Sequence, residues 1–182
     1  VVTMQGVGVQ LRRFWRHLWL DERASRRWLD DAAAERLRRR IEVSETHHRG
    51  EIRVCVEASL PLRWLWPPAD QAAMAARVRE RALAWFGRLR VWDTEDNAGV
   101  LIYLLLAERA IEIVADRGLA RRVSPAQWTA VVDDLQATLC AKRPEAGLAA
   151  AIDAVDRWLC HHFPSAGNRP NPNELPDGII RV

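Results

Sequence analysis

The fold of this chain is decided by residues 92–118, which read WDTEDNAGVLIYLLLAERAIEIVADRG. The segment begins with acidic and amide side chains and continues as an apolar run, a pattern typical of a turn followed by a buried strand. A second apolar run follows after a few polar residues and ends at Asp116-Arg117-Gly118. Two strands this close in sequence predict a β-hairpin.

The register of this hairpin depends on its turn. If Glu108 and Arg109 are the two turn residues, antiparallel pairing places Leu101 opposite Asp116. Gly99 then lies opposite the glycine that closes the quoted stretch. The hairpin would thereby bring carboxylates that are distant in sequence to one end of the sheet.

Outside the hairpin, the periodicity of apolar residues predicts one more strand and several helices. The alternation over residues 51–57 is typical of a half-buried strand. Helices are expected over residues 9–20, 30–48 and 69–90, and two more are expected to begin at Ser124-Pro125 and at Pro144. A strand–helix–strand unit requires a parallel pair of strands. We therefore predict an α/β fold, a single three-layer α/β/α sandwich whose small mixed sheet joins a strand–helix–strand unit to the hairpin.

The chain is expected to form one domain with an extension at each end. Its 182 residues are enough for one well-buried core. Residues 1–29 are predicted to be an amphipathic helical extension and residues 30–163 the α/β domain. Residues 164–182 are rich in proline, asparagine and glycine, which predicts an irregular tail.

The composition argues against several classes of function. A net charge of +3, from 27 basic and 24 acidic residues, is too small to indicate nucleic-acid binding. The three cysteines form no C-x-x-C pair, so neither a disulfide framework nor a zinc ribbon is indicated. The longest apolar run, residues 98–107, is about half as long as a membrane span, and no signal peptide is visible. These observations favour a cytoplasmic protein.

The acidic cluster is the main candidate for a binding site. Carboxylate and amide oxygens suit a hard cation, calcium or alternatively magnesium. Glu51 would join the cluster if its strand is parallel to the first strand of the hairpin. The alternative is turn chemistry, because Asp and Asn make Asx turns and helix caps wherever chains reverse. The candidate metal ligands are Asp93, Asp96, Asn97, Asp116 and Glu51.

The N-terminal helix allows two interpretations. Its predicted inner face carries Leu11, Phe14, Trp15 and Leu18, while its arginines point elsewhere. It could make peripheral contact with an anionic membrane surface, or it could pack on the domain and expose its arginines to water.

The sequence contains neither of two common enzyme motifs that would indicate a catalytic site. The chain has neither a G-x-x-x-x-G-K-[ST] phosphate loop nor a G-x-S-x-G nucleophile elbow. We therefore assign no catalytic residues. Any hydrolase activity would need a metal ion at the acidic cluster.

Several ordered motifs resemble those of the TPM domain family. They are EVSETHHRGEIR at 42–53, LRVWDT at 89–94, GVLIYLLLA at 99–107 and VADRG at 114–118. The resemblance covers roughly residues 35–163 and is closest to a short bacterial subgroup without a signal peptide or membrane helix. The tail sequence NPNELPD at 171–177 is also similar to that subgroup.

The resemblance implies an α/β/α sandwich and a limited set of functions. Some TPM domains bind calcium, one plant member is credited with acid phosphatase activity and photosystem repair, and others are accessory proteins at membranes. The family's acidic and amide positions correspond here to Asp93, Asn97 and Asp116, with Glu51 and Asp96 as further candidates. Relatives commonly carry two consecutive asparagines before the glycine, whereas this chain has Asn97-Ala98-Gly99, so one side-chain amide is missing.

Three functional hypotheses follow from these observations. The first is a non-catalytic accessory or binding module with a divalent-cation site, which acts beside an unidentified, membrane-associated protein partner. The second is a metal-assisted acid phosphatase. The third is a structural interaction domain whose partner binds the loop that carries Trp64 and Trp66.

Overall fold

A computed structural model describes residues 15–66, 70–165 and 179–182. Residues 15–19 are helical. The labelled elements then follow in chain order as α2 (Glu22–Trp28), α3 (Asp31–Glu45), β1 (Glu51–Glu57), α4 (Leu62–Leu65), α5 (Gln71–Arg88), β2 (Gly99–Leu105), β3 (Ala110–Ala115), α6 (Arg117–Ala120), α7 (Pro125–Cys140), α8 (Pro144–His162) and β4 (Ile179–Arg181).

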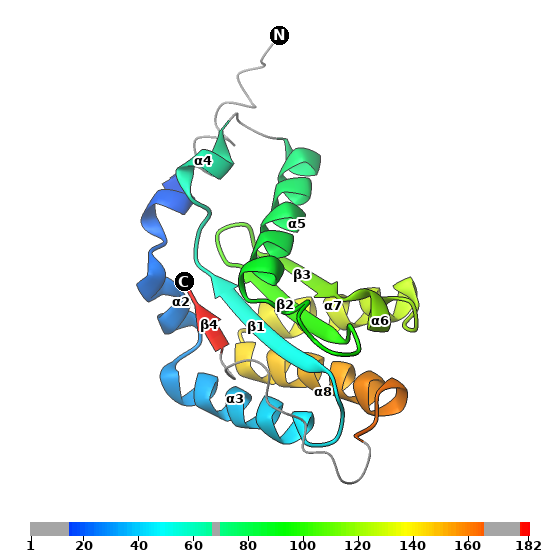
Figure 1. The fold of residues 1–182 in the computed structure, drawn as a ribbon. Helices are drawn as coiled ribbons and strands as arrows, with labels where there is room; N and C mark the ends of the chain where they lie inside the picture. Colours follow the sequence, from blue (N-terminus) through cyan, green and yellow to red (C-terminus); the bar gives the residue numbers. More distant parts are fainter. Residues whose placement is uncertain (1–14, 67–69, 166–178) are drawn as a thin grey trace.

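The four strands form one open sheet in the order β3-β2-β1-β4 (Figure 1). The β1–α5–β2 segment is the predicted strand–helix–strand unit, and β1 and β2 are parallel from Glu51 opposite Gly99 onwards. β2 and β3 are antiparallel, as the hairpin prediction requires. The mixed sheet is therefore confirmed.

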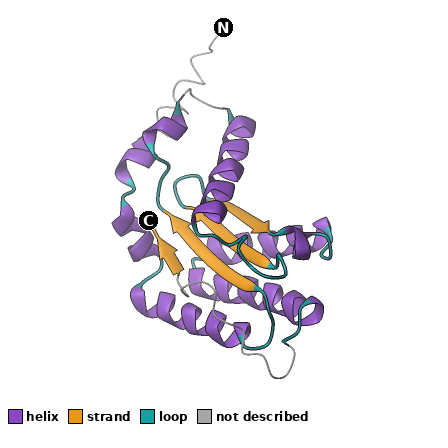
Figure 2. Cartoon of the chain, in the orientation of Figure 1, coloured by secondary structure: helices purple, strands orange, loops and turns teal. Residues whose placement is uncertain are grey.

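Helices cover both faces of this sheet, which confirms the three-layer sandwich (Figures 1 and 2). Apolar side chains of β1 and β2 alternate between two cores. Val54, Val100 and Ile102 belong to the core beneath α3, α7 and α8. Cys55 and Tyr103 belong to the core beneath α5. No described helix is long and apolar enough to span a membrane.

Helix starts follow local sequence signals closely. Asp30 caps α3 with a 2.7 Å hydrogen bond from the Ala33 N–H. Ser124 and Gln127 form the predicted capping box at the start of α7. Pro144 opens α8 as expected.

The predicted hairpin register is wrong by two residues. Leu105 pairs with Ala110, so the turn has four residues, 106–109, instead of two. Gly99 consequently lies opposite Asp116, whose N–H donates to the Gly99 carbonyl at 2.8 Å. Because the shift is an even number, each side chain stays on its predicted face of the sheet.

Two predictions about strands are also wrong. β1 was expected to be half-buried, but all seven of its residues are buried, since it lies between β2 and β4 with helices on both faces. Residues 164–182 were expected to be irregular, but residues 179–181 form β4, which pairs in parallel with β1, with Val54 opposite Ile179. Residues 166–178 of this segment lie outside the described residues.

The orientation predicted for the N-terminal helix is wrong where it can be compared. Trp15 and Leu18 were assigned to its inner face but are half exposed, and His17 is the buried residue. Leu11 and Phe14 lie outside the described residues.

Candidate functional site

The predicted ligands converge on the edge of the sheet where β1 and β2 begin, which we call the amino edge. Glu51 opens β1 and lies opposite Gly99, the first residue of β2. Asp116 follows directly after β3, whose antiparallel direction brings its end to the same edge. The chain therefore gathers these residues as predicted, although through a different hairpin register.

The two loops at this edge are in close backbone contact. The Gly118 N–H donates to the Asn97 carbonyl at 2.9 Å. A Cβ atom at Gly118 would lie 2.5 Å from the carbonyl oxygens of both Asp96 and Asn97, so only glycine fits there. Asn97 itself has a φ of 53°, a left-handed conformation that asparagine tolerates. The sequence thus places two backbone carbonyls against the start of α6.

Two aspartates at this edge retain unused acceptor capacity. Asp116 caps α6 through Oδ1, which accepts from the Arg117 N–H at 2.6 Å. Its Oδ2 is buried without a hydrogen-bond partner among the described residues. Asp96 Oδ2 is also buried without a hydrogen bond there, although it forms an ion pair with Arg49 Nη1 at 2.8 Å. Arg49 thus places a positive charge beside Asp96, but the geometry of this ion pair is not that of a hydrogen bond to Oδ2.

The other candidate ligands have different surroundings. Asp93 is half exposed and forms an ion pair with Arg90 within its own turn. Asn97 Oδ1 accepts from Arg117 Nε at 3.1 Å. Glu51 is buried. Among the described residues, no group of three or more His, Cys, Asp and Glu side chains has the geometry to hold a metal ion.

Ala98 occupies the position at which the resemblance to the TPM domain family leads us to expect a second asparagine. It is fully buried and belongs to the core beneath α3, α7 and α8. Its N–H donates to Thr94 Oγ1 at 3.0 Å, which fixes the turn that precedes β2. In this chain the position therefore contributes packing.

Comparison with known proteins identifies the family. The model of the TPM domain matches residues 24–157. The chain belongs to the TPM domain family. The fold of this TPM domain is similar to the NMR structure of BA42 protein from the psychrophilic bacterium Bizionia argentinensis, with a TM-score of 0.69 and 25% sequence identity over 85% of this chain and 95% of that chain. A comparison with curated proteins gives no match.

The opposite edge of the TPM domain's sheet, which we call the carboxyl edge, holds a polar cluster that sequence reasoning missed. Glu57 at the end of β1 is buried and forms an ion pair with Arg81 Nη2 at 2.5 Å. Its Oε2 also accepts from Tyr103 Oη at 2.7 Å and Trp85 Nε1 at 2.8 Å. Burial and the adjacent carboxylate raise the pKa of Tyr103. The spacing of Arg81 and Trp85, four residues apart on one helix, is the only sequence signal for this cluster.

A Ser–His–Asp contact near the amino edge resembles a catalytic triad but has the opposite hydrogen-bond direction. The Gly50 N–H donates to His48 Nδ1 at 3.2 Å, so Nε2 carries the proton of the neutral ring. Nε2 then donates to Ser44 Oγ at 2.9 Å, and Ser44 donates to Asp156 at 2.6 Å. A nucleophilic serine would instead have to donate to the imidazole. This contact fastens α3 to α8, and burial lowers the pKa of His48 to about 4.

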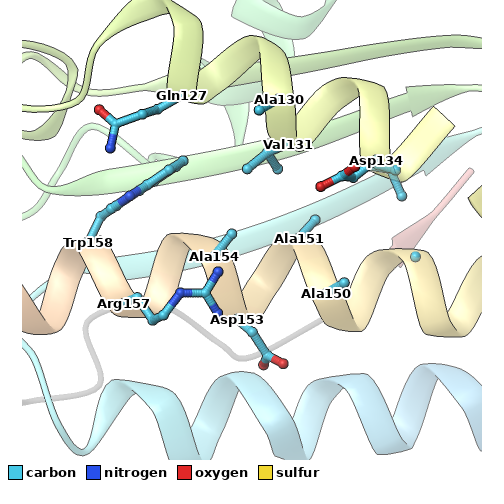
Figure 3. Close-up of a pocket in the computed structure, with 12 residues that line it drawn as sticks. Gln127, Ala130, Val131, Asp134, Ala150, Ala151, Asp153, Ala154, Arg157 and Trp158 are labelled. Atoms are coloured by element: carbon cyan, nitrogen blue, oxygen red, sulfur yellow. The ribbon is translucent and has the colours of Figure 1, made fainter. Parts of the chain in front are cut away.

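A hollow of about 390 Å³ between α7 and α8 lies apart from these clusters (Figure 3). Small side chains line it from both helices, Ala130 from α7 and Ala151 and Ala154 from α8, and Trp158 lies at one end. None of the predicted ligands lines it. The predicted metal ligands and the lining of this hollow are therefore different sets of residues.

Proposed function

We propose that this TPM domain is a non-catalytic binding module that holds a divalent cation, calcium in preference to magnesium, at the amino edge of its sheet. The observation that carries the proposal is the pair of buried oxygens, Oδ2 of Asp96 and Oδ2 of Asp116, that lack hydrogen bonds among the described residues. The resemblance to membrane-associated family members extends the proposal to an accessory role beside a membrane protein.

The chemistry of the edge supports a hard cation. An ionised carboxylate only accepts, and a buried oxygen without a donor costs about 1–3 kcal/mol. A calcium ion would remove that cost, and it takes carboxylate, amide and backbone oxygens together. The carbonyl groups of Asp96 and Asn97 would supply the backbone oxygens. They lie close to the start of α6 because Gly118 has no Cβ atom to clash with them.

Arg49 is the natural competitor of the cation. Its guanidinium lies 2.8 Å from Asp96 Oδ2 and neutralises part of the negative charge. Binding of a cation at Asp96 would require Arg49 to move away. We therefore expect the Arg49→Ala substitution to tighten calcium binding, whereas substitution of the carboxylates abolishes it.

The test is a calcium titration followed by the melting temperature and by NMR. A calcium concentration about 100-fold above the dissociation constant stabilises the folded state by about 2.7 kcal/mol, or roughly 5–10 °C for a chain of this size. The double variant Asp96→Asn/Asp116→Asn should lose this rise in melting temperature. The control Asp133→Asn, at an exposed residue of α7, should keep it. Asp93→Asn shows whether that residue completes the ligand set.

Two results would overturn the proposal. One is an unchanged melting temperature together with unperturbed NMR signals from residues 93–118 in calcium. The other is hydrolysis of a generic phosphomonoester by the metal-loaded protein. That result would show that the protein is a metal-assisted phosphatase and not a non-catalytic binding module.

A further inference from the structure

Large apolar side chains are exposed together at one end of the molecule. Trp15, Leu18 and Trp19 belong to the helical residues 15–19, and Leu62 and Trp66 lie on or directly after α4. The hydrogen bond from the Leu60 N–H to His17 holds residues 15–19 near the start of α4, and Figure 1 shows the dark blue start of the described chain beside that helix. Trp19 and Trp66 are each 77% exposed, more than any other large apolar residue described. We call this set of five residues the tryptophan end.

Buried polar contacts fix the outward direction of these side chains. His17 is buried, its Nδ1 accepts from the Leu60 N–H at 3.0 Å, and its Nε2 lies 2.9 Å from Oε1 of Glu108 in the hairpin turn. With His17 turned inward, its helical neighbours Trp15 and Trp19 must point toward solvent. The polar side of this helical segment therefore packs on the domain while its apolar side faces water.

A basic hollow adjoins the tryptophan end. It has a volume of about 330 Å³ and is lined by Arg63, Trp64, Trp66, Arg77 and Glu80. Arg63 is exposed, and Arg77 donates to the Trp64 carbonyl at 3.1 Å. Two guanidinium groups against one carboxylate make the hollow suitable for an anion.

We propose that the tryptophan end docks on an anionic phospholipid bilayer, with the lipid phosphate in the basic hollow. Trp is enriched at the membrane–water interface because its ring is apolar and its N–H is polar. Leu18 and Leu62 supply further apolar area, and the arginines of the hollow face the negative lipid surface. Exposure of three tryptophans to water costs free energy that a bilayer interface recovers. This surface is distinct from the amino edge, so the proposal does not depend on the cation.

The main test is co-sedimentation of the full chain with vesicles in EDTA, which keeps the result independent of calcium. The protein should bind vesicles made of equal parts phosphatidylglycerol and phosphatidylcholine and should bind phosphatidylcholine alone much more weakly. Binding to the anionic vesicles should fall as salt is added. Soluble glycerophosphate should not displace the protein, because a headgroup alone lacks the apolar contact.

Matched variants distinguish vesicle binding through the tryptophan end from nonspecific vesicle binding. Trp19→Ala/Trp66→Ala should weaken vesicle binding by about tenfold or more, and both sites are exposed enough to leave the fold intact. Trp92→Ala, at a tryptophan that is 51% exposed elsewhere on the surface, should bind as the wild type does. Arg63→Glu should also weaken binding, whereas Arg121→Glu beside α6 should not.

Fluorescence gives a second measurement on the unmodified chain. Bromine atoms on the acyl chains should quench part of the tryptophan emission, and this quenching should persist in Trp92→Ala but not in Trp19→Ala/Trp66→Ala. The proposal fails if the wild type stays in the supernatant with anionic vesicles. It also fails if the double variant binds and is quenched as strongly as the wild type.

Discussion

The two edges of the sheet differ in how their carboxylate oxygens are hydrogen-bonded. At the carboxyl edge, Glu57 has a guanidinium, a phenol and an indole N–H on its two oxygens. At the amino edge, Asp96 and Asp116 each keep one buried oxygen without a hydrogen bond among the described residues. Glu57 is therefore fully hydrogen-bonded by the protein itself, whereas Asp96 has an ion pair with Arg49 in place of a hydrogen bond to Oδ2, and Asp116 leaves Oδ2 without one among the described residues.

This difference separates a structural cluster from a candidate binding site. Open α/β sheets usually bind ligands at the carboxyl ends of their strands. Here that end is filled by the Glu57–Arg81 pair, whose guanidinium carbon lies 5.5 Å from the ring centroid of Trp64 and 5.3 Å from that of Trp85. Our proposed ligand site lies instead at the amino edge, beside the end of β3.

The largest effect is expected from breaking the closed cluster at the carboxyl edge. Arg81→Ala leaves Glu57 buried without its counter-ion and should lower the free energy of unfolding by about 3–5 kcal/mol. Arg40→Ala is the control, because its bidentate pair with Asp153 is half exposed and contributes about 1 kcal/mol or less. Urea denaturation measures both, and equal losses would remove the distinction between buried and exposed pairs.

The next effect is a pH dependence of the free energy of unfolding, which arises from His48 in the Ser44–His48–Asp156 contact. The pKa of His48 is about 4 in the folded protein and about 6.5 in the unfolded chain, so the unfolded state binds the proton first as the pH falls. The stabilisation is complete above pH ~6.5 and is lost down to pH ~4, by roughly 3 kcal/mol. His48→Gln should flatten this part of the profile measured by urea denaturation. Exposed His161→Gln should leave it unchanged.

A smaller effect tests the packing of the two loops at the amino edge. Gly118→Ala forces a methyl group against the carbonyls of Asp96 and Asn97 and should cost about 1–3 kcal/mol. It should also remove the calcium-dependent rise in melting temperature. A variant that keeps this rise would show that the carbonyls are not part of the site.

The smallest effect has the opposite sign and comes from the matched glycine in α5. A Cβ atom at Gly87 meets nothing within 4 Å, and the residue is exposed in a helix. Gly87→Ala should therefore stabilise the protein by about 0.5–1 kcal/mol. Thermal unfolding in the absence of calcium compares it directly with Gly118→Ala.

The features that could be predicted from sequence are those specified by nearby residues. The capping box of Ser124 and Gln127 lies within four positions, and the apolar run of β2 identifies itself as a buried strand. The family motifs correctly indicated the three-layer fold. The amino edge followed from these local elements because parallel strands begin at the same side of a sheet.

The features that were missed depend on partners far away in the chain. β4 is only three residues long and is held by β1, more than a hundred positions earlier. Glu57 looks like a surface residue at a strand end, yet its partners come from α5 and β2. His17 looks like the polar side of a helix, and only contacts with Leu60 and Glu108 turn it inward.

The short strand β4 has a consequence for the solution behaviour of the chain. It pairs with β1, whose seven residues are all buried and include the apolar run from Val54 to Val56. A chain that ends before Ile179 would leave Val54, Cys55 and Val56 without their β4 partners, and an unpaired strand edge can recruit strands from other molecules. The match to the TPM domain ends at residue 157 and so omits β4. We therefore expect a protein trimmed to the family boundaries to aggregate more readily than the full chain.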